Sequence, residues 1–249
     1  TTDTRTQVTQ ASRKTFIPQA IIPNTVAGPD QLEIKSVPRE RPQNTEISIQ
    51  QSAIGVNYTD AYFREGLYGT ELPAIIGDQA VGTVIEVGAD ITDFSVGDKI
   101  AYASVFGSYQ ETRCINSNRA VKIPAGIPDE VVAATLTRGL TAEYLLFRLH
   151  ALQASETIII HAAAGGTGSI MCQWARSVGA TIIGTVGDES KVSIAKEHGC
   201  DHVLIHSDTN FITKVLELTD GKLVDVVYDS IGKDTVETSV HCLKDSRQR

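Results

Sequence analysis

A glycine-rich loop carries the clearest chemical signal in the sequence. Residues 161–168 read HAAAGGTG, follow the apolar run at 157–160 and open a helical pattern. In the fingerprint G-x-G-x-x-G, Gly165 stands where the backbone approaches a pyrophosphate, and Gly168 where the helix lies close to its strand. Ala163 replaces the glycine of the tight turn, which alanine tolerates when φ is negative. We therefore predict that the backbone at the start of this helix binds a dinucleotide through Ala164, Gly165, Gly166, Thr167 and Gly168; a turn without ligand is the alternative.

Residues after the next strand indicate the type of dinucleotide. Enzymes that use NAD usually have Asp or Glu at this strand end, whereas this chain has Val186 followed by Gly187. Lys191 lies four residues beyond Gly187, where its charge favours a 2′-phosphate, although Asp188 would repel that group. His206, just after the third strand, could stack on adenine or meet the same phosphate. We expect NADPH, contacted by Gly187, Lys191 and His206; solvated surface side chains are the alternative.

The pattern of apolar residues predicts two domains that position these groups. Residues 16–137 contain short, β-branched apolar runs broken by glycine and proline, which predict a β-rich barrel or sandwich. In residues 138–249, apolar runs at 157–162, 181–186, 202–205 and 224–229 alternate with helical segments, which predicts a parallel α/β sheet. Ser230 and Gly232 follow its fourth strand, where the crevice opens, and are further cofactor candidates. Because a full dinucleotide fold has six strands, we expect this domain to be C-terminally incomplete.

The composition argues against several functional classes. The net charge is −8 and no basic run occurs, which disfavours a general nucleic-acid or anionic-membrane surface. Apolar stretches are too short to span a membrane, and the four cysteines lack metal or disulfide spacing, so we expect free thiols and a cytoplasmic protein. Residues 1–15 are polar and aperiodic, which predicts disorder; a targeting remnant is the alternative.

Six motifs, in this order, resemble the zinc-free quinone oxidoreductase (zeta-crystallin-like) branch of the medium-chain dehydrogenase/reductase superfamily. They are AIGVNYTDAYFREGLY (53–68), IIGDQAVGTVIEVG (75–88), VGDKIAY (96–102), GLTAEYLL (139–146), HAAAGGTGSIMCQWA (161–175) and VVYDSIGKDT (226–235). The resemblance implies an N-terminal GroES-like β-rich domain and a Rossmann dinucleotide-binding domain. It also implies that the chain of the family continues beyond the last residues of this sequence.

The resemblance also implies roles for individual residues. Zinc enzymes of the superfamily have Cys-His and His-Glu where this chain has Asn57-Tyr58 and Asp78-Gln79, and amides are poor zinc ligands, so we expect no metal. Tyr62, Arg64 and Tyr68 of the motif Y-x-R-x-G-x-Y would line the substrate pocket, with tyrosine hydroxyls donating to a quinone oxygen; packed aromatics and a surface ion pair are the alternative. Asn57 and Thr141 would contact the nicotinamide side of the cofactor.

These observations together predict NADPH-dependent reduction of a small quinone or conjugated carbonyl compound, without metal. A zinc-free 2-alkenal or enoyl double-bond reductase is the nearest alternative, because it would share the cofactor and the fold. A non-catalytic NADP-binding or RNA-binding relative is the second alternative, although the acidic charge balance disfavours RNA. We expect a homodimer if the chain is complete.

Overall fold

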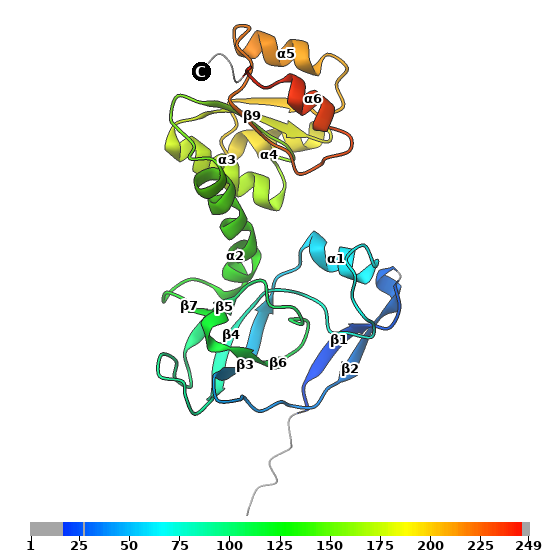
Figure 1. Cartoon of the computed structure of the whole chain (residues 1–249), viewed down its shortest axis with the longest axis vertical. Helices are drawn as coiled ribbons and strands as arrows, with labels where there is room; N and C mark the ends of the chain where they lie inside the picture. Colours follow the sequence, from blue (N-terminus) through cyan, green and yellow to red (C-terminus); the bar gives the residue numbers. More distant parts are fainter. Residues whose placement is uncertain (1–16, 27, 246–249) are drawn as a thin grey trace, which may run out of the picture. The chain divides into compact units, whose positions relative to one another are not determined.

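The computed structural model describes residues 17–26 and 28–245, which form two compact units that divide between Ala134 and Thr135 (Figure 1). The prediction of disorder at residues 1–15 lies outside the described residues. The α/β fold class and its two parts, β-rich and Rossmann-type, are confirmed. No helix among the described residues is long and apolar enough to cross a membrane.

The first unit contains an antiparallel sheet, a separate hairpin and one short helix. The hairpin pairs β1 (Gln19–Pro23) with β2 (Leu32–Ser36), and the sheet has the strand order β6–β3–β4–β5–β7. Its strands are β3 (Glu46–Ile54), β4 (Ala80–Val87), β5 (Lys99–Tyr102), β6 (Thr112–Asn116) and β7 (Ala120–Lys122). Helix α1 spans Tyr58–Arg64, and the 3-10 turns η1 and η2 span Pro29–Gln31 and Ser117–Arg119.

Alternation along β3 builds the core of this unit. Ile47 and Ile49 are fully buried and lie in one cluster with Val84 of β4 and with Ile100 and Tyr102 of β5. Because successive side chains of a strand point to opposite faces, this period of two places one face of β3 against the core. The sheet positions α1, which follows the end of β3 after three residues.

The second unit is built around a parallel sheet with the order β10–β9–β8–β11. Its strands are β8 (Thr157–Ile160), β9 (Thr181–Val186), β10 (His202–Ile205) and β11 (Val226–Tyr228). The helices and turns are α2 (Asp129–Glu143), which begins in the first unit, η3 (Tyr144–Leu149), α3 (Gly166–Val178), η4 (Glu189–Lys191), α4 (Val192–Glu197), α5 (Phe211–Leu218) and α6 (Val236–His241). In chain order this is the 3-2-1-4 arrangement of a dinucleotide-binding half.

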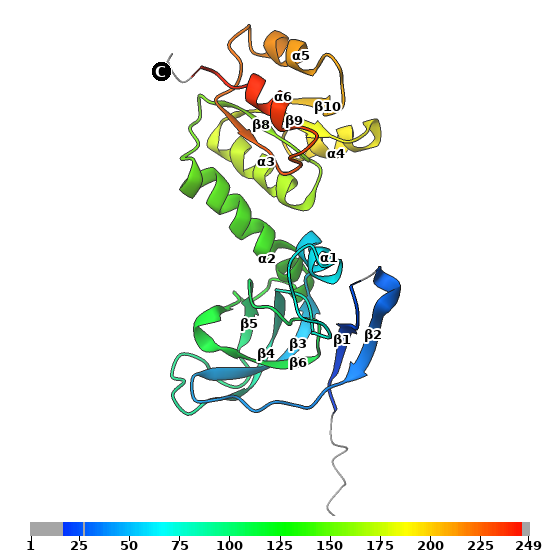
Figure 2. The same cartoon turned by 45° about the vertical axis from the view of Figure 1, so that its right-hand side comes forward.

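Isoleucines on both faces of β8 and β9 explain why helices cover both sides of the sheet. Ile158 and Ile182 pack in a cluster with residues of α3 and α4, whereas Ile159 and Ile183 pack with Phe211 of α5. Figure 2 shows α5 and α6 on the other side of these strands from α3 and α4. Continuous apolar runs, rather than alternation, are typical of such doubly covered parallel strands.

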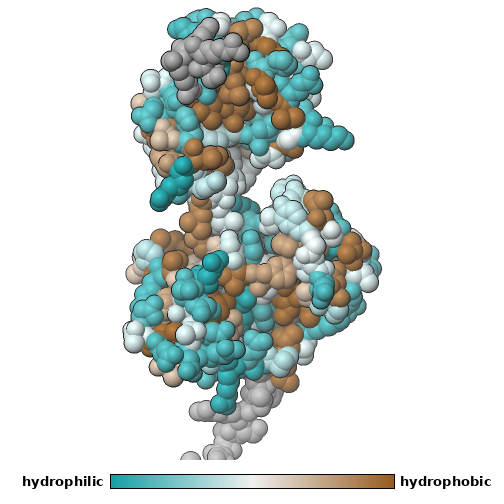
Figure 3. All heavy atoms as spheres, in the orientation of Figure 1, coloured by the Kyte–Doolittle hydropathy of each residue, from teal (hydrophilic) through white to brown (hydrophobic). Residues whose placement is uncertain are grey.

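Exposed hydrophobic side chains are scattered over both units. On the face drawn in Figure 3, hydrophobic residues lie among hydrophilic ones rather than forming one continuous surface. Helix α6 exposes Val236 and Val240, which lie one turn apart. Isolated exposed apolar residues are normal for a folded protein and carry no functional argument by themselves.

Candidate functional site

The glycine loop leaves the end of β8 and turns directly into α3. The N–H of Ala163 donates to the carbonyl of Thr185 in β9 at 2.9 Å, and the N–H of Gly165 donates to the carbonyl of Ala162 at 2.8 Å. Gly165 is the N-cap of α3. The left-handed residue of the turn is Ala162, at φ 51°, and not Ala163, where the fingerprint has its first glycine. The first turn of α3 therefore presents backbone N–H groups that have no acceptor within the helix.

Gly168 lies where the helix passes closest to the end of β8. A Cβ atom at this position would overlap the carbonyl oxygen of Ala162 and lie 3.0 Å from the Cα of Ala163. Gly168, Cys172 and Ala175 are buried along one face of α3, and their small side chains allow this helix to pack closely on the sheet. Any larger residue at 168 would push the start of α3 away from the strand.

Arg138 adds a positive charge beside the loop. A Cβ atom on Gly166 would lie only 2.6 Å from the Nε of Arg138, so the guanidinium group of this α2 residue packs against the first residue of α3. Arg138 lies far from the glycine loop in the sequence, so this contact could not be predicted from the sequence. An arginine at a helix N-terminus strengthens the preference of that terminus for anions.

Gly187, Lys191 and His206 gather at the carboxyl end of β9. His206 Nδ1 lies 3.1 Å from the carbonyl oxygen of Val186, and the Cε1 of its ring would lie 3.8 Å from a Cβ atom on Gly187. Lys191 ends the turn η4 and is half exposed, with its Nζ 3.7 Å from the carboxylate of Asp188. The structure thus places two nitrogen-bearing side chains near one strand end, and their contact with a ribose phosphate remains a prediction.

His161 forms a buried link between the glycine loop and the last helix. Its side chain comes directly after β8 and is only 3% exposed. Nδ1 lies 2.8 Å from the hydroxyl of Thr185, and Nε2 lies 3.0 Å from the hydroxyl of Ser239 in α6. Burial lowers the pKa of His161, and the nearby charge of Asp229 opposes this only in part. His161 was assigned no role from the sequence. A polar residue directly after a buried strand is the signal that could have indicated its structural role.

Asp229 fixes the turn that carries Ser230 and Gly232. Its Oδ1 accepts the N–H groups of Ile231 and Gly232, both at 2.9 Å, and its Oδ2 accepts the hydroxyl of Ser239 at 2.8 Å. Burial alone would raise the pKa of Asp229, but these donors outweigh it and lower the pKa to about 2. The turn after β11 is thereby joined through Ser239 to His161, and so to the end of β8.

The remaining cofactor candidate of this unit, Thr141, makes a different contact. Its hydroxyl donates to the carbonyl of Thr137 at 2.8 Å, which is a bond within α2. A threonine hydroxyl that bonds four residues back is common in helices. Its predicted contact with the nicotinamide side of the cofactor remains a prediction.

In the first unit, Tyr62 and Tyr68 lie together around α1. Their rings meet edge to face at 5.5 Å between centroids, and the N–H of Tyr68 donates to the carbonyl of Tyr62 at 3.2 Å. Phe63 also meets Tyr68 edge to face. The side chain of Arg64 is largely buried and forms an ion pair with Glu65, while its buried Nε has no hydrogen-bond partner among the described residues. The motif thus forms an aromatic cluster beside the guanidinium group of Arg64, which pairs with Glu65 but leaves Nε without a hydrogen bond among the described residues.

Asn57 and Asp78 stand where the resemblance aligns zinc-ligand motifs of the zinc enzymes, and a second carboxyl group, Asp60, lies beside them. Asn57 Nδ2 donates to Asp78 Oδ1 at 3.3 Å, while Asp60 accepts the N–H of Asn57 at 2.8 Å and the hydroxyl of Tyr109 at 2.9 Å. Burial raises the pKa of Asp60, and burial together with the charge of Asp60 raises the pKa of Asp78. Across residues 17–26 and 28–245, no cluster of His, Cys, Asp and Glu could hold a metal ion.

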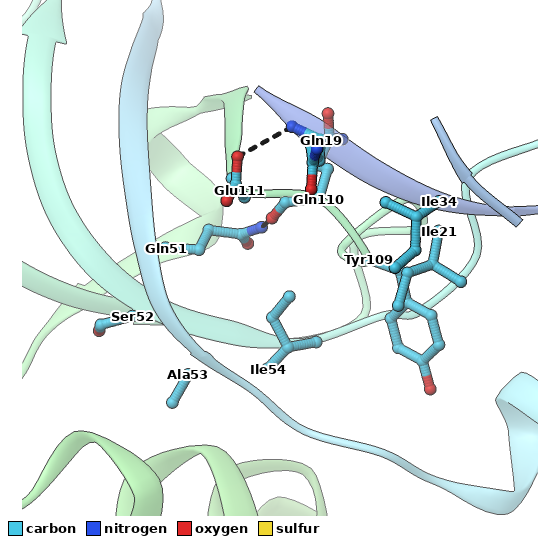
Figure 4. A pocket seen from close by; sticks show the side chains of 10 residues that line it. All are labelled: Gln19, Ile21, Ile34, Gln51, Ser52, Ala53, Ile54, Tyr109, Gln110 and Glu111. Atoms are coloured by element: carbon cyan, nitrogen blue, oxygen red, sulfur yellow. Dashed lines mark hydrogen bonds between the residues drawn. The ribbon is translucent and has the colours of Figure 1, made fainter. Parts of the chain in front are cut away.

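A cavity of about 350 Å³ lies in the first unit, between the β1–β2 hairpin and β3 (Figure 4). Glu111 and Gln19 form a hydrogen bond at one side, and the ring of Tyr109 lies beside Ile21 and Ile34 with its hydroxyl directed away from Glu111. The cavity is lined by Gln19, Ile21, Ile34, Gln51, Ser52, Ala53, Ile54, Tyr109, Gln110 and Glu111. The predicted catalytic residues Tyr62, Arg64 and Tyr68 do not line it.

The strand order of the parallel sheet and the glycine loop at the start of α3 define a Rossmann-type dinucleotide-binding unit. In this chain it follows a β-rich unit. Known families match both parts. The family described as "Alcohol dehydrogenase GroES-like domain" matches residues 43–155, and the one described as "Zinc-binding dehydrogenase" matches residues 166–246.

Individual relatives indicate which branch of this superfamily the chain resembles in sequence and structure. The "Quinone oxidoreductase" of Pseudomonas aeruginosa is 43% identical over 218 residues, which cover 87% of this chain and 67% of that protein. The "2-haloacrylate reductase" of Burkholderia sp. is 41% identical over 224 residues, with the same coverage of both chains. The crystal structure of Escherichia coli quinone oxidoreductase complexed with NADPH superposes with a TM-score of 0.88 at 38% identity, over 91% of this chain and 70% of that one.

The chain therefore belongs to the quinone oxidoreductase branch of the medium-chain dehydrogenase/reductase superfamily, the branch without catalytic zinc. It spans about two thirds of the length of the curated relatives it matches.

Proposed function

We propose that this chain performs NADPH-dependent reduction of a small quinone. The observation that carries the proposal is the loop at the start of α3, where Gly168 allows close approach and Arg138 covers Gly166. Relatives named quinone oxidoreductase, and structures of such enzymes with NADPH, support it. The reaction type corresponds to an NADPH:quinone oxidoreductase.

The second unit offers hydrogen-bond donors and positive charges that suit the phosphate groups of NADPH. Backbone N–H groups of Gly166, Thr167 and Gly168 would bind the pyrophosphate, with Ala164 and Gly165 shaping the turn and Arg138 adding charge. Lys191 would pair with the 2′-phosphate, and His206 would lie against the adenosine beside Gly187. Ser230 and Gly232, held by Asp229, would contact the nicotinamide side, as would Thr141 and, from the first unit, Asn57.

The first unit supplies the substrate groups. When bound, NADPH supplies the hydride for the reduction. The hydroxyls of Tyr62 and Tyr68 would donate hydrogen bonds to a quinone oxygen as negative charge develops on it, and the cation of Arg64 would stabilise the same charge. Asn57, held by Asp78, would orient the cofactor amide or ribose.

Two other functions stay open. Reduction of a conjugated double bond is favoured by the relative named 2-haloacrylate reductase, because its name describes an alkene conjugated to a carboxyl group. A non-catalytic NADP-binding or RNA-binding role would use the same fold. Homodimer formation and a cytoplasmic location also remain predictions.

Oxidation of NADPH by the purified chain tests the proposal. We expect the NADPH absorbance to fall when a simple benzoquinone is added and to fall much more slowly with a 2-alkenal. Faster turnover of the alkenal would support the double-bond reductase instead. NADPH binding without turnover of either compound would contradict the proposal and favour the non-catalytic role.

A further inference from the structure

Two cysteines that are 28 residues apart in sequence lie with their sulfur atoms in contact in the second unit. The Sγ atoms of Cys172 and Cys200 are 3.4 Å apart. Cys172 lies on the buried face of α3 and is fully buried, and Cys200 lies in the turn between α4 and β10 and is 5% exposed. Neither side chain has a role in the proposed cofactor site.

Small residues next to Cys200 leave room for its sulfur to lie against that of Cys172. Gly184 in β9 has no side chain, and a Cβ atom there would overlap the sulfur of Cys200 and lie 2.8 Å from the Cβ of Ala163. Cys200 therefore fills the space over Gly184, directly beside the first part of the glycine loop. From this place its sulfur reaches the sulfur of Cys172 on the neighbouring helix.

We propose that Cys172 and Cys200 are a dithiol site that reacts with hydrogen peroxide and closes to an intramolecular disulfide. The sulfur atoms already touch, so the bond requires them to approach by roughly an ångström and a half, to the disulfide length of about 2.0 Å. This site is independent of the proposed quinone reduction, and its chemistry requires no NADPH.

The two thiols have different parts in the reaction. The contact between the two sulfur atoms lowers the pKa of Cys200, against the effect of burial, and the N–H of Gly184 acts in the same direction. The same contact and burial raise the pKa of Cys172. Cys200 is also the more exposed of the two, at 5% against 0% for Cys172. It is therefore the sulfur that attacks the peroxide as a thiolate, because the thiolate is the nucleophilic form.

The reaction balances in two steps. The Cys200 thiolate attacks one peroxide oxygen, the O–O bond breaks, and the other oxygen leaves as water after taking up a proton, which leaves a sulfenic acid on Cys200. The sulfur of Cys172 then attacks the Cys200 sulfur, the S–O bond breaks, and the hydroxyl leaves as water with the proton of Cys172. In total two thiols and one hydrogen peroxide give one disulfide and two waters.

Cys200 is 5% exposed and lies in a turn that the side chain of Arg176 contacts. The side chain of Arg176, 64% exposed, covers the turn: its Nη1 lies 3.3 Å from the carbonyl oxygen of Gly199 and 3.9 Å from the carboxylate of Asp201. Arg176 thus contacts the residues before and after Cys200 through one weak hydrogen bond and one surface ion pair, which cost little to break. Movement of Arg176 would open the turn to a molecule the size of hydrogen peroxide.

The other two cysteines serve as internal controls. Cys114 lies in the first unit, and Cys242 packs in the cluster on the opposite face of the parallel sheet. Burial raises the pKa of both thiols, to about 11 for Cys242. They are therefore expected to react more slowly with peroxide and not to join the pair.

The experiment treats the folded, reduced wild-type chain with hydrogen peroxide, blocks remaining thiols and maps peptides by mass spectrometry without reduction. We expect one cross-linked peptide pair that contains Cys172 and Cys200, lacks two hydrogens and is separated by dithiothreitol. The oxidised chain should melt several degrees higher, because the link closes a loop of about 29 residues in the unfolded chain.

Variants separate this site from random oxidation. The variant with Cys114→Ser and Cys242→Ser keeps only the pair and should form the link to the same extent as the wild type. Cys172→Ser should form no link and should instead accumulate a Cys200 sulfenic acid that dimedone traps. The proposal is overturned if folded protein links Cys172 or Cys200 to Cys114 or Cys242, or if both thiols stay open to alkylation after unfolding while Cys114 is oxidised.

Discussion

Nε2 of His161 lies 3.0 Å from the hydroxyl oxygen of Ser239, which ties the strand end before the glycine loop to helix α6. Because Ser239 donates its own proton to Asp229, its oxygen must accept the proton of the imidazole. His161 is then neutral with the proton on Nε2, and Nδ1 accepts the hydroxyl of Thr185. A chain of hydrogen bonds thus connects β9, β8, α6 and the turn after β11.

Replacement of His161 should therefore destabilise the second unit. His161→Phe leaves the buried hydroxyl of Thr185 without its partner and should reduce the free energy of unfolding by about 1–3 kcal/mol, measured by urea denaturation. The double variant with Ser239→Ala should cost less than the sum of the two single changes, by about 0.5–3 kcal/mol. Additive costs would show that the two side chains do not act together.

Close packing at Gly168 gives a second prediction. Gly168→Ala should reduce the free energy of unfolding by about 1–3 kcal/mol and weaken NADPH binding, because the added methyl group overlaps the carbonyl of Ala162. Gly139→Ala in α2 is the matched control, since a Cβ atom there meets nothing within 4 Å and alanine favours a helix by about 1 kcal/mol. Equal effects of both changes, measured by thermal unfolding and NADPH titration, would contradict the packing argument.

The sequence predicts the parallel sheet better than the site around it. The runs at 157–162, 181–186, 202–205 and 224–229 correspond to β8, β9, β10 and β11, because buried parallel strands need continuous apolar residues. Strand β6 and helix α1 were not predicted: β6, Thr112–Asn116, has only one apolar residue besides Cys114, and α1 is seven residues long. Such short elements are specified by tertiary packing more than by local pattern.

Side-chain contacts between distant segments could not be predicted. Arg138 reaches Gly166 from another helix, and His161 meets Ser239 across 78 residues, so no local spacing signals either contact. The left-handed residue of the turn, Ala162, was not predicted, whereas Ala163 is not among the residues with positive φ, which is the condition under which alanine is tolerated there. Residue types in the fingerprint restrict the turn without fixing its dihedral angles.

From the raised pKa values of Asp60 and Asp78 in the first unit, we expect the stability of the fold to depend on pH. Burial and the charge of Asp60 raise the pKa of Asp78, so the folded state favours its protonated form. Ionised Asp78 therefore reduces stability at neutral pH, and this penalty disappears as the pH falls from the raised pKa toward the unfolded value of about 3.9. The groups that face it are Asp60, Tyr102 and Tyr109.

Asp78→Asn should raise the melting temperature at neutral pH by roughly a few degrees, and the difference from the wild type should shrink toward about pH 4. The amide oxygen can still accept the bond from Asn57. Thermal unfolding at both pH values measures the effect. A variant that melts below the wild type at neutral pH would mean that the ionised carboxylate is stabilising.

We expect the second unit to bind NADPH and to distinguish it from NADH through Lys191. Calorimetric titration of the wild type, Lys191→Ala and the exposed control Lys196→Ala with both cofactors tests it most directly. A lost charge-assisted contact of about 1.5–3 kcal/mol should weaken NADPH binding of Lys191→Ala by about 10- to 150-fold and leave NADH binding nearly unchanged. Lys196→Ala should bind both cofactors like the wild type. Equal losses for both cofactors, or unchanged NADPH affinity, would show that Lys191 does not bind the 2′-phosphate.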